Sequence, residues 1–159
     1  MNRFLKLVVL SVAVFLTCAG LAHRLYAEKN LMGEDPWSPG DLIQPEELAH
    51  MLSNQQKPVL LQVGIVHLYK MGHIPGSKYA GPANAAEGLD SLKKQAQGLS
   101  RDSQIVCYCG CCPWANCPNM RPAYQTLREM GFKKVKLLYL PNSFGQDWSS
   151  KGYPVEKSS

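Results

Sequence analysis

A dense group of cysteines marks the part of this chain that is best suited to chemistry. Five of the six cysteines lie between Cys107 and Cys117, directly after the β-prone run Gln104-Ile105-Val106. Thiolates grouped at the end of a strand attack sulfur, exchange disulfides or bind soft metal ions. The residue types and their spacing therefore predict thiolate chemistry in one of three forms: sulfur transfer, redox exchange or metal binding.

Cys109 is the strongest candidate for a nucleophile, because it ends the predicted strand and a loop and a helix start follow it. In open parallel sheets, sites form at the carboxyl ends of the strands. Loop amides, that of Gly110 among them, and a helix N-terminus favour negative charge, so they lower a thiol pKa and hold a persulfide or an oxyanion. Arg121, at the predicted helix start, would add a cation to this anion site.

The elements that must position this loop alternate between strands and helices. Short apolar runs predict buried strands, and apolar residues at helical spacing predict helices that face a core. The alternation predicts an α/β fold with a mainly parallel central sheet flanked by helices. The expected strands are 59–63, 104–109 and 134–140 with a short one near 79, and the expected helices are 45–52, 66–70, 83–98, 122–130 and 143–150.

The N-terminus has the pattern of an export signal. Arg3 and Lys6 precede the apolar stretch 7–16, and small residues follow it. The apolar stretch is shorter than the ~20 residues that a membrane-spanning helix needs. We expect residues 1–27 to be a signal peptide, with an uncleaved signal anchor as the alternative, and residues 28–40 to be a linker.

Export would affect the oxidation state of the cysteines, because thiols outside the cytoplasm tend to oxidise. The expected location is the periplasm or cell envelope, with membrane contact only through an uncleaved N-terminus or a lipid on Cys18. Removal of the signal leaves five cysteines. An odd count means that at least one thiol is free, ligated or modified.

Length and composition fit one globular domain. The chain has 159 residues, 45% of them hydrophobic and 18% charged, which is enough for a buried core. Its net charge is +5, and without Arg3, Lys6 and Arg24 the 14 basic and 12 acidic residues give +2. So mild a charge, without a basic stripe interleaved with aromatic residues, gives no support for nucleic acid as a partner.

Several motifs occur in order along residues 41–156. They are Gly72-His73-Ile74-Pro75-Gly76-Ser77, the strand 105–109, Leu127-Arg128-Glu129-Met130-Gly131-Phe132, and Trp148 followed by Gly152-Tyr153-Pro154. With these motifs, residues 41–156 resemble the rhodanese-like domains. The resemblance implies the fold of that family, a parallel α/β sheet flanked by helices, and its activity, the transfer of sulfane sulfur through a cysteine persulfide. It also implies that Cys109 stands at the catalytic position and that His73 braces a turn.

Two features depart from the pattern of the family. The helix after Cys109 is not expected to begin before Arg121, so the loop is several residues longer than usual. The Asp-Val-Arg that usually follows the first core strand is replaced by Gln62-Val63-Gly64. The resemblance therefore implies the fold more directly than it implies ordinary activity on thiosulfate.

The leading prediction is an exported sulfurtransferase or sulfur carrier that holds a persulfide on Cys109 and needs no cofactor. Cys111, Cys112 and Cys117 would act as resolving or relay thiols that attack the persulfide and leave a disulfide. The expected partners are a small sulfur-containing donor and a thiol or redox protein. The alternative is a non-enzymatic metal-binding or thiol-redox module, in which Cys109, Cys111, Cys112 and Cys117 bind copper, zinc or an iron–sulfur cluster.

Overall fold

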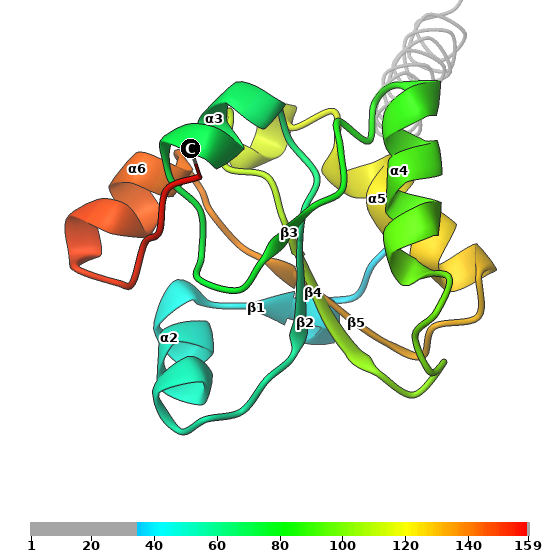
Figure 1. Ribbon diagram of the computed structural model, residues 1–159, viewed down its shortest axis with the longest axis horizontal. Helices are drawn as coiled ribbons and strands as arrows, with labels where there is room; N and C mark the ends of the chain where they lie inside the picture. The colour runs from blue at the N-terminus through cyan, green and yellow to red at the C-terminus, as the bar shows by residue number, and fades with distance from the viewer. Residues whose placement is uncertain (1–34, 159) are drawn as a thin grey trace, which may run out of the picture. The chain divides into compact units, whose positions relative to one another are not determined.

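The computed structural model describes residues 35–158. The predicted signal peptide, Cys18 and residues 28–34 of the predicted linker lie outside this range. The described chain forms a five-stranded sheet in which every pair of neighbouring strands is parallel (Figure 1). In sheet order the strands are β1 (Leu42–Ile43), β5 (Lys134–Leu138), β4 (Gln104–Tyr108), β2 (Val59–Gln62) and β3 (Lys78–Tyr79).

The central strand β4 is buried on both of its faces. Ile105 and Cys107 belong to one hydrophobic cluster, whereas Val106 and Tyr108 belong to the other. Such double burial is the rule for parallel sheets, because helices cover both faces and the strands become nearly continuous apolar runs. The predicted α/β class with a parallel central sheet is therefore confirmed.

Helices cover the two faces of the sheet. The cluster on one face includes Leu92 of α4 and Leu127 of α5, and the cluster on the other includes Leu48 of α2 and Trp148, which follows α6 (Figure 1). The α-helices are α2 (Pro45–Ser53), α3 (Val66–Met71), α4 (Ala86–Ala96), α5 (Met120–Glu129) and α6 (Phe144–Asp147), and the 3₁₀ turns are η1 (Pro39–Asp41), η2 (Trp114–Asn116) and η3 (Ser149–Lys151).

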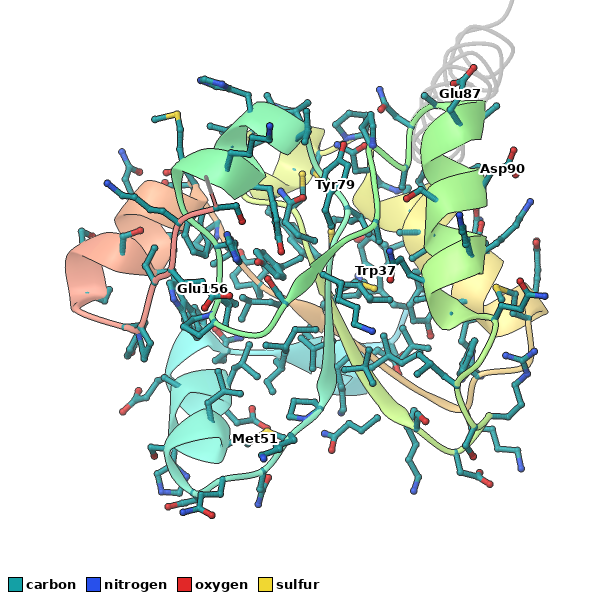
Figure 2. All side chains as sticks on the ribbon, viewed as in Figure 1. Trp37, Met51, Tyr79, Glu87, Asp90 and Glu156 are labelled. Atoms are coloured by element: carbon teal, nitrogen blue, oxygen red, sulfur yellow. The ribbon has the colours of Figure 1, made fainter. Side chains whose placement is uncertain are left out.

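Helix α4 shows how the apolar spacing of the sequence sets the packing. Leu92 and Ala96 are fully buried against the sheet. Glu87 and Asp90 are exposed and project away from the sheet (Figure 2). One apolar stripe and one charged face are what an amphipathic surface helix requires.

Some short elements differ from the sequence expectation. Strand β1 was not expected, and it exists because Leu42 and Ile43 pair with Leu137 and Leu138 of β5. The expected helix over 143–150 is divided into the short helix α6 and the turn η3. Elements of two to four residues are set by their tertiary partners, because so few residues carry too little periodicity to specify them.

The described part of the predicted linker packs on the domain. The Trp37 ring lies 5.4 Å from the Trp114 ring and 5.9 Å from the Tyr124 ring, both edge to face. Asp41 accepts a hydrogen bond from the Tyr124 hydroxyl at 3.1 Å. These contacts join the segment before β1 to α5 and to the loop that carries the cysteines.

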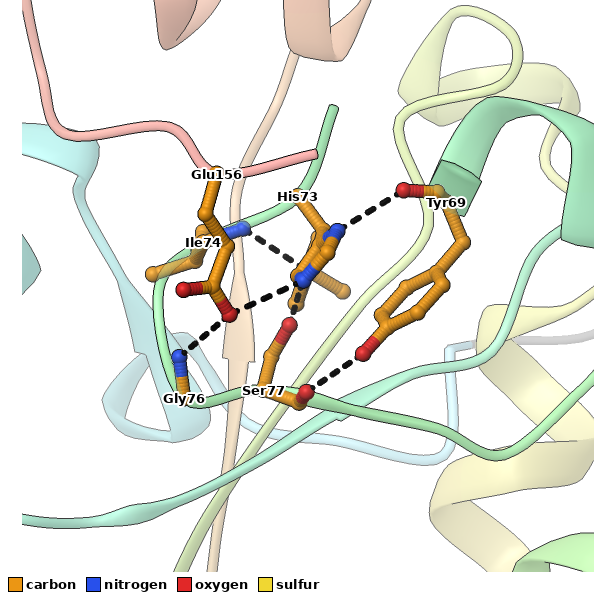
Figure 3. Close-up of polar contacts among 7 residues, drawn as sticks. Tyr69, His73, Ile74, Gly76, Ser77 and Glu156 are labelled. Carbon is orange, nitrogen blue, oxygen red and sulfur yellow. Dashed lines mark hydrogen bonds and ion pairs between the residues drawn. The ribbon is translucent and has the colours of Figure 1, made fainter. Parts of the chain in front are cut away.

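The C-terminal segment is hydrogen-bonded to the turn that follows α3 (Figure 3). His73 and Glu156 exchange two backbone hydrogen bonds of 2.9 Å, and His73 Nε2 lies 3.0 Å from the Glu156 carboxylate. The Tyr69 ring stacks on His73 at 3.9 Å. The buried Tyr108 hydroxyl accepts a hydrogen bond from the Ile74 amide at 3.1 Å, so β4 fixes the same turn.

Within residues 35–158, no helix has both the length and the apolar character needed to cross a membrane.

Candidate active site

The cysteine loop leaves the sheet at the carboxyl end of β4. The Val63 amide, which follows β2, donates to the Tyr108 carbonyl at 2.8 Å, so the ends of the two central strands lie together. Cys109 is the first residue after β4 and only 4% exposed. Its sulfur therefore lies at the edge of the sheet where parallel α/β folds place their sites.

Three thiols meet there, and we refer to Cys109, Cys111 and Cys117 as the thiol cluster. Their sulfur atoms all lie within 4.8 Å of one another, and those of Cys109 and Cys111 are 3.0 Å apart. Cys112 Sγ lies beside the cluster, 3.5 Å from Cys111 Sγ. The structure thus brings together the four cysteines that the sequence singled out, all as free thiols.

Cys107 is separate from this group. It lies on β4 with no exposed surface, and burial raises the pKa of its thiol to about 12. A buried neutral thiol behaves as a small apolar side chain. Cys107 is therefore a core residue and a suitable internal control for the reactive cysteines.

Gly110 makes the turn that folds Cys111 back towards Cys109. Its φ is +70°, a conformation that side chains other than glycine rarely adopt. Its carbonyl accepts a hydrogen bond of 3.0 Å from the Phe144 amide, and a Cβ atom here would lie 2.6 Å from Phe144 Cβ. Both the backbone angle and the close contact with α6 therefore require glycine.

Gly64 accounts for one departure from the usual pattern after the first core strand. A Cβ atom at this position would lie 2.9 Å from Cys109 Sγ and 2.9 Å from Gln62 Nε2. Gln62 spans the same space, since its amide donates to the Cys109 carbonyl at 3.4 Å and accepts from the Gly64 amide at 3.3 Å. The space that a side chain would fill is taken here by the Cys109 sulfur and the Gln62 amide.

Asn119 is a site residue that the sequence reasoning missed. Its side-chain amide, 2% exposed, donates to Cys109 Sγ at 3.4 Å and approaches Cys111 Sγ at 3.8 Å. Its carbonyl oxygen accepts from the Asn84 amide at 3.0 Å, which fixes the orientation of the side chain. An amide donor directed at two sulfur atoms stabilises negative charge on either of them.

The sequence predicts that the helix after the cysteine loop begins no earlier than Arg121, and helix α5 begins one residue before that, at Met120. Pro122 is tolerated as its third residue, because the first amides of a helix have no partner within it. Asn119 is consequently the N-cap residue, a position that favours Asn. The preference of the N-cap position for Asn is the sequence feature that points to Asn119. Its side chain, however, contacts the sulfur atoms and does not cap the helix.

The thiols share protons in a way that favours one thiolate. Hydrogen bonds from Cys109 and then Cys117 lower the pKa of Cys111 well below the ordinary thiol range. The hydrogen bond to Cys111 is also the main reason why the pKa of Cys109 is raised, and burial adds to it. Burial raises the pKa of Cys112 to about 12. The cluster therefore releases a first proton readily and a second with difficulty, as coupled groups do.

Arg121, in the first turn of α5, lies beside Trp37. Its guanidinium carbon is 5.7 Å from the centre of the Trp37 ring. Trp114 packs between Trp37 and Tyr139, with ring centres 5.4 and 5.2 Å away, and holds the loop on the domain. A role for Arg121 and for the Gly110 amide in binding an anion stays a prediction.

Two of the cluster thiols open onto a cleft of about 680 Å³. Cys109 and Cys111 contribute to its lining, together with residues of α3, of α6 and of the C-terminal segment. Cys112 and Cys117 do not line this cleft; together with Cys109 they line a separate void of about 10 Å³. A molecule in the cleft therefore meets Cys109 and Cys111 before the other thiols.

Comparison with known structures supports the same fold. A rhodanese-like domain from Anabaena sp. is 20% identical, with 74% of this chain and 80% of that chain covered and a TM-score of 0.55. A protein from Bacillus halodurans is 19% identical, with 87% and 86% covered and a TM-score of 0.59. A thiosulfate sulfurtransferase from Pseudomonas aeruginosa is 22% identical with a TM-score of 0.54, and 79% of this chain covers only 20% of that one.

Comparison with the curated proteins finds no significant match. The sequence profile of the rhodanese-like domain matches residues 44–139, which include β2, β4, the thiol cluster and α5. This match spans more than half of the chain, and the parallel sheet agrees with it. The chain belongs to the family of rhodanese-like domains.

Proposed function

We propose that this protein is a sulfurtransferase or sulfur carrier of the periplasm or cell envelope that holds a persulfide on Cys109. The observation that carries the proposal is the position of Cys109 at the carboxyl end of β4, with the Cys111 sulfur 3.0 Å away. Membership of the rhodanese-like family supports it. The proposed partners are a small sulfur donor and a thiol or redox protein.

Sulfur loading needs a thiolate and a leaving group. Cys109 passes its proton to the Cys111 thiolate and attacks the outer sulfur of a donor such as thiosulfate. The S–S bond of the donor breaks, sulfite leaves with its electron pair, and the outer sulfur stays on Cys109 as a persulfide. The Asn119 amide, 3.4 Å from Cys109 Sγ, stabilises the charge on the sulfur, and the loop amides and Arg121 are the proposed anion contacts.

Unloading uses the neighbouring thiols. Cys111 passes its proton to the outer sulfur of the Cys109 persulfide and, as thiolate, attacks the inner sulfur; the S–S bond of the persulfide breaks, hydrosulfide leaves with the electron pair, and a Cys109–Cys111 disulfide forms. Cys117 lies close enough to take the same part, and Cys112 could exchange with the disulfide afterwards. A thiol or redox protein then returns the pair to the reduced state. This sequence makes release of sulfide dependent on the additional cysteines of the loop.

The test is the intact mass of the reduced, metal-free protein before and after exposure to thiosulfate and to cysteine persulfide. We expect a transient gain of one sulfur atom at early times, followed by the loss of two hydrogen atoms as the disulfide forms, in the parent protein and in Cys107→Ala, and no gain in Cys109→Ser. Cys107→Ala is the matched control, because Cys107 lies in the core outside the cluster. Undiminished loading of a folded Cys109→Ser protein would remove Cys109 from its proposed role.

A second function is favoured by one specific observation, the three sulfur atoms within 4.8 Å of one another. Three thiolates at such distances suit copper(I), and a fourth ligand from Cys112 would suit zinc. This alternative predicts one tightly bound metal ion per chain in titrations against a competing chelator, unchanged in Cys107→Ala. It also predicts that the bound metal blocks sulfur loading, because both need the Cys109 sulfur.

A further inference from the structure

The cleft beside Cys109 and Cys111 has the size of a site for an organic molecule. Its volume of about 680 Å³ falls within the range of roughly 300–1,000 Å³ found for sites that enclose organic ligands. A small oxyanion such as thiosulfate would occupy only a little of this space. The cleft therefore provides a large contact surface that the transfer of a single sulfur atom does not itself need.

The wall of the cleft is mainly apolar and comes from three elements. Met71, at the end of α3, is 57% exposed, and Val155, on the C-terminal segment, is 39% exposed. Large apolar side chains this exposed gain most from covering by an apolar molecule. The apolar residues that line the cleft are Leu68, Met71, Phe144, Tyr153 and Val155.

One residue gives the cleft a fixed positive charge. Among the described residues that line it, Lys157 is the one with a permanent charge. Its chain position is fixed, because Glu156 next to it is bonded to His73 and to the Gly76 amide (Figure 3). A doubly charged anion placed against the apolar wall would lose hydration without enough compensation, whereas a single carboxylate at the rim has Lys157 as its partner.

We propose that the sulfur donor of this site is an organic persulfide with an apolar chain that ends in a carboxylate. The proposal rests on the function proposed above and names its substrate class. The chain covers the apolar wall, the carboxylate pairs with Lys157, and the terminal S–SH group meets Cys109. Cys109, as thiolate, attacks the terminal sulfur, the S–S bond of the donor breaks, and the donor leaves as an organic thiolate that takes up a proton.

The test compares organic persulfides that differ in chain length and end group with one another and with thiosulfate. The probes are thiosulfate and freshly prepared persulfides of mercaptoethanol, of mercaptooctanoic acid and of its amide. The rate of sulfur loading on the reduced full chain is followed by intact mass, and each rate is divided by that of free cysteine with the same donor. The octanoic acid persulfide is expected to load about tenfold faster than the mercaptoethanol persulfide, because several CH₂ groups are partly buried.

Variants locate the effect in the cleft. Met71→Ser is expected to lower the rate with the octanoic acid persulfide about threefold and to leave the mercaptoethanol persulfide unaffected. Val66→Ser is the matched control, since Val66 is an exposed apolar residue of the same helix that does not line the cleft. Lys157→Gln is expected to remove the preference for the acid over the amide, which should be about threefold in the parent protein.

The outcomes separate the two proposals. Equal normalised rates for long and short chains, or a faster reaction with thiosulfate, would overturn the substrate class while leaving the persulfide on Cys109 intact. A chain-length preference that survives Met71→Ser would also overturn it, because the cleft would then not be the site of binding. Failure of every donor to load Cys109 would defeat the proposed function and this inference together.

Discussion

At the scale of residues, the reactivity of the site depends on three residues next to the Cys109 sulfur. The Cys111 sulfur is 3.0 Å away, the Asn119 amide donates to it at 3.4 Å, and the absence of a side chain at Gly64 leaves room for it. Each residue has a separate effect on the sulfur. Cys111 exchanges a proton with it, Asn119 stabilises negative charge on it, and Gly64 leaves the space that it occupies. Each effect can be removed by a single substitution.

The effect of Asn119 on charge is testable through pH. Asn119→Ala removes a donor to the thiolates, and Asn119→Asp keeps the acceptor for the Asn84 amide but adds a negative charge beside them. Both changes disfavour the thiolate, so the pKa of the cluster rises, by about one unit for Ala and further for Asp. The rate of iodoacetamide alkylation near neutral pH should fall in the order parent, Ala, Asp. Superimposable pH profiles for the three proteins would exclude the proposed contact.

The space at Gly64 is testable by adding one carbon atom. Gly64→Ala places a Cβ atom 2.9 Å from both Cys109 Sγ and Gln62 Nε2, and these mobile side-chain ends must move. We expect sulfur loading to slow by about tenfold, since small displacements of a nucleophile are costly, while unfolding free energy changes by about 1 kcal/mol or less. Gly98→Ala is the control, because its Cβ would meet nothing within 4 Å. Equal loading rates for the two variants would show that the space at Gly64 does not set the position of the Cys109 sulfur.

At the scale of elements, the long, regular segments could be predicted from the sequence and the short ones could not. Strands β2, β4 and β5 follow from apolar runs, and α4 from helical spacing, because each has enough residues to show a period. Strand β1 depends on pairing with β5, which no local pattern reveals. The sequence predicts that four cysteines of one loop act together, but it does not reveal the contact of Asn119 with Cys109, which depends on where α5 begins and on how the loop closes.

The turn between α3 and β3 is the element that holds the C-terminal wall of the cleft. Its stability depends on the buried Tyr108 hydroxyl, which bonds to the Ile74 amide and, at 2.7 Å, to the Ser77 hydroxyl. Tyr108→Phe leaves both partners buried without this contact, at a cost of about 1–3 kcal/mol of unfolding free energy. Urea denaturation should show a lower midpoint with an unchanged slope.

Tyr139→Phe provides the comparison for that measurement. Tyr139 packs on Trp114, and within residues 35–158 its hydroxyl has no hydrogen-bond partner. Its loss is expected to change the unfolding free energy by about 0.5 kcal/mol or less. If Tyr108→Phe were as stable as Tyr139→Phe, the hydroxyl network would not be what fixes the turn.

At the scale of the whole molecule, the buried and the clustered thiols are expected to respond differently to an oxidising compartment. Cys107 has no exposed surface, whereas Cys109 and Cys111 are in contact and face the cleft. Mild oxidation of the folded protein should therefore consume two thiols as a Cys109–Cys111 disulfide and leave Cys107 reduced. Thiol counting after denaturation, with peptide mapping, measures this. A disulfide that includes Cys107 would contradict the described burial of this residue on β4.

The most direct test of the proposed sulfur transfer follows one labelled sulfur atom through the protein. The reduced chain is loaded from a donor whose outer sulfur is isotopically labelled, quenched at increasing times, and mapped by peptide mass spectrometry. We expect the label to appear first on Cys109 and then to leave as labelled hydrosulfide while a Cys109–Cys111 disulfide accumulates. Label that appears first on Cys111, Cys112 or Cys117, or a persulfide on Cys109 that persists without disulfide formation, would contradict the proposed sulfur transfer.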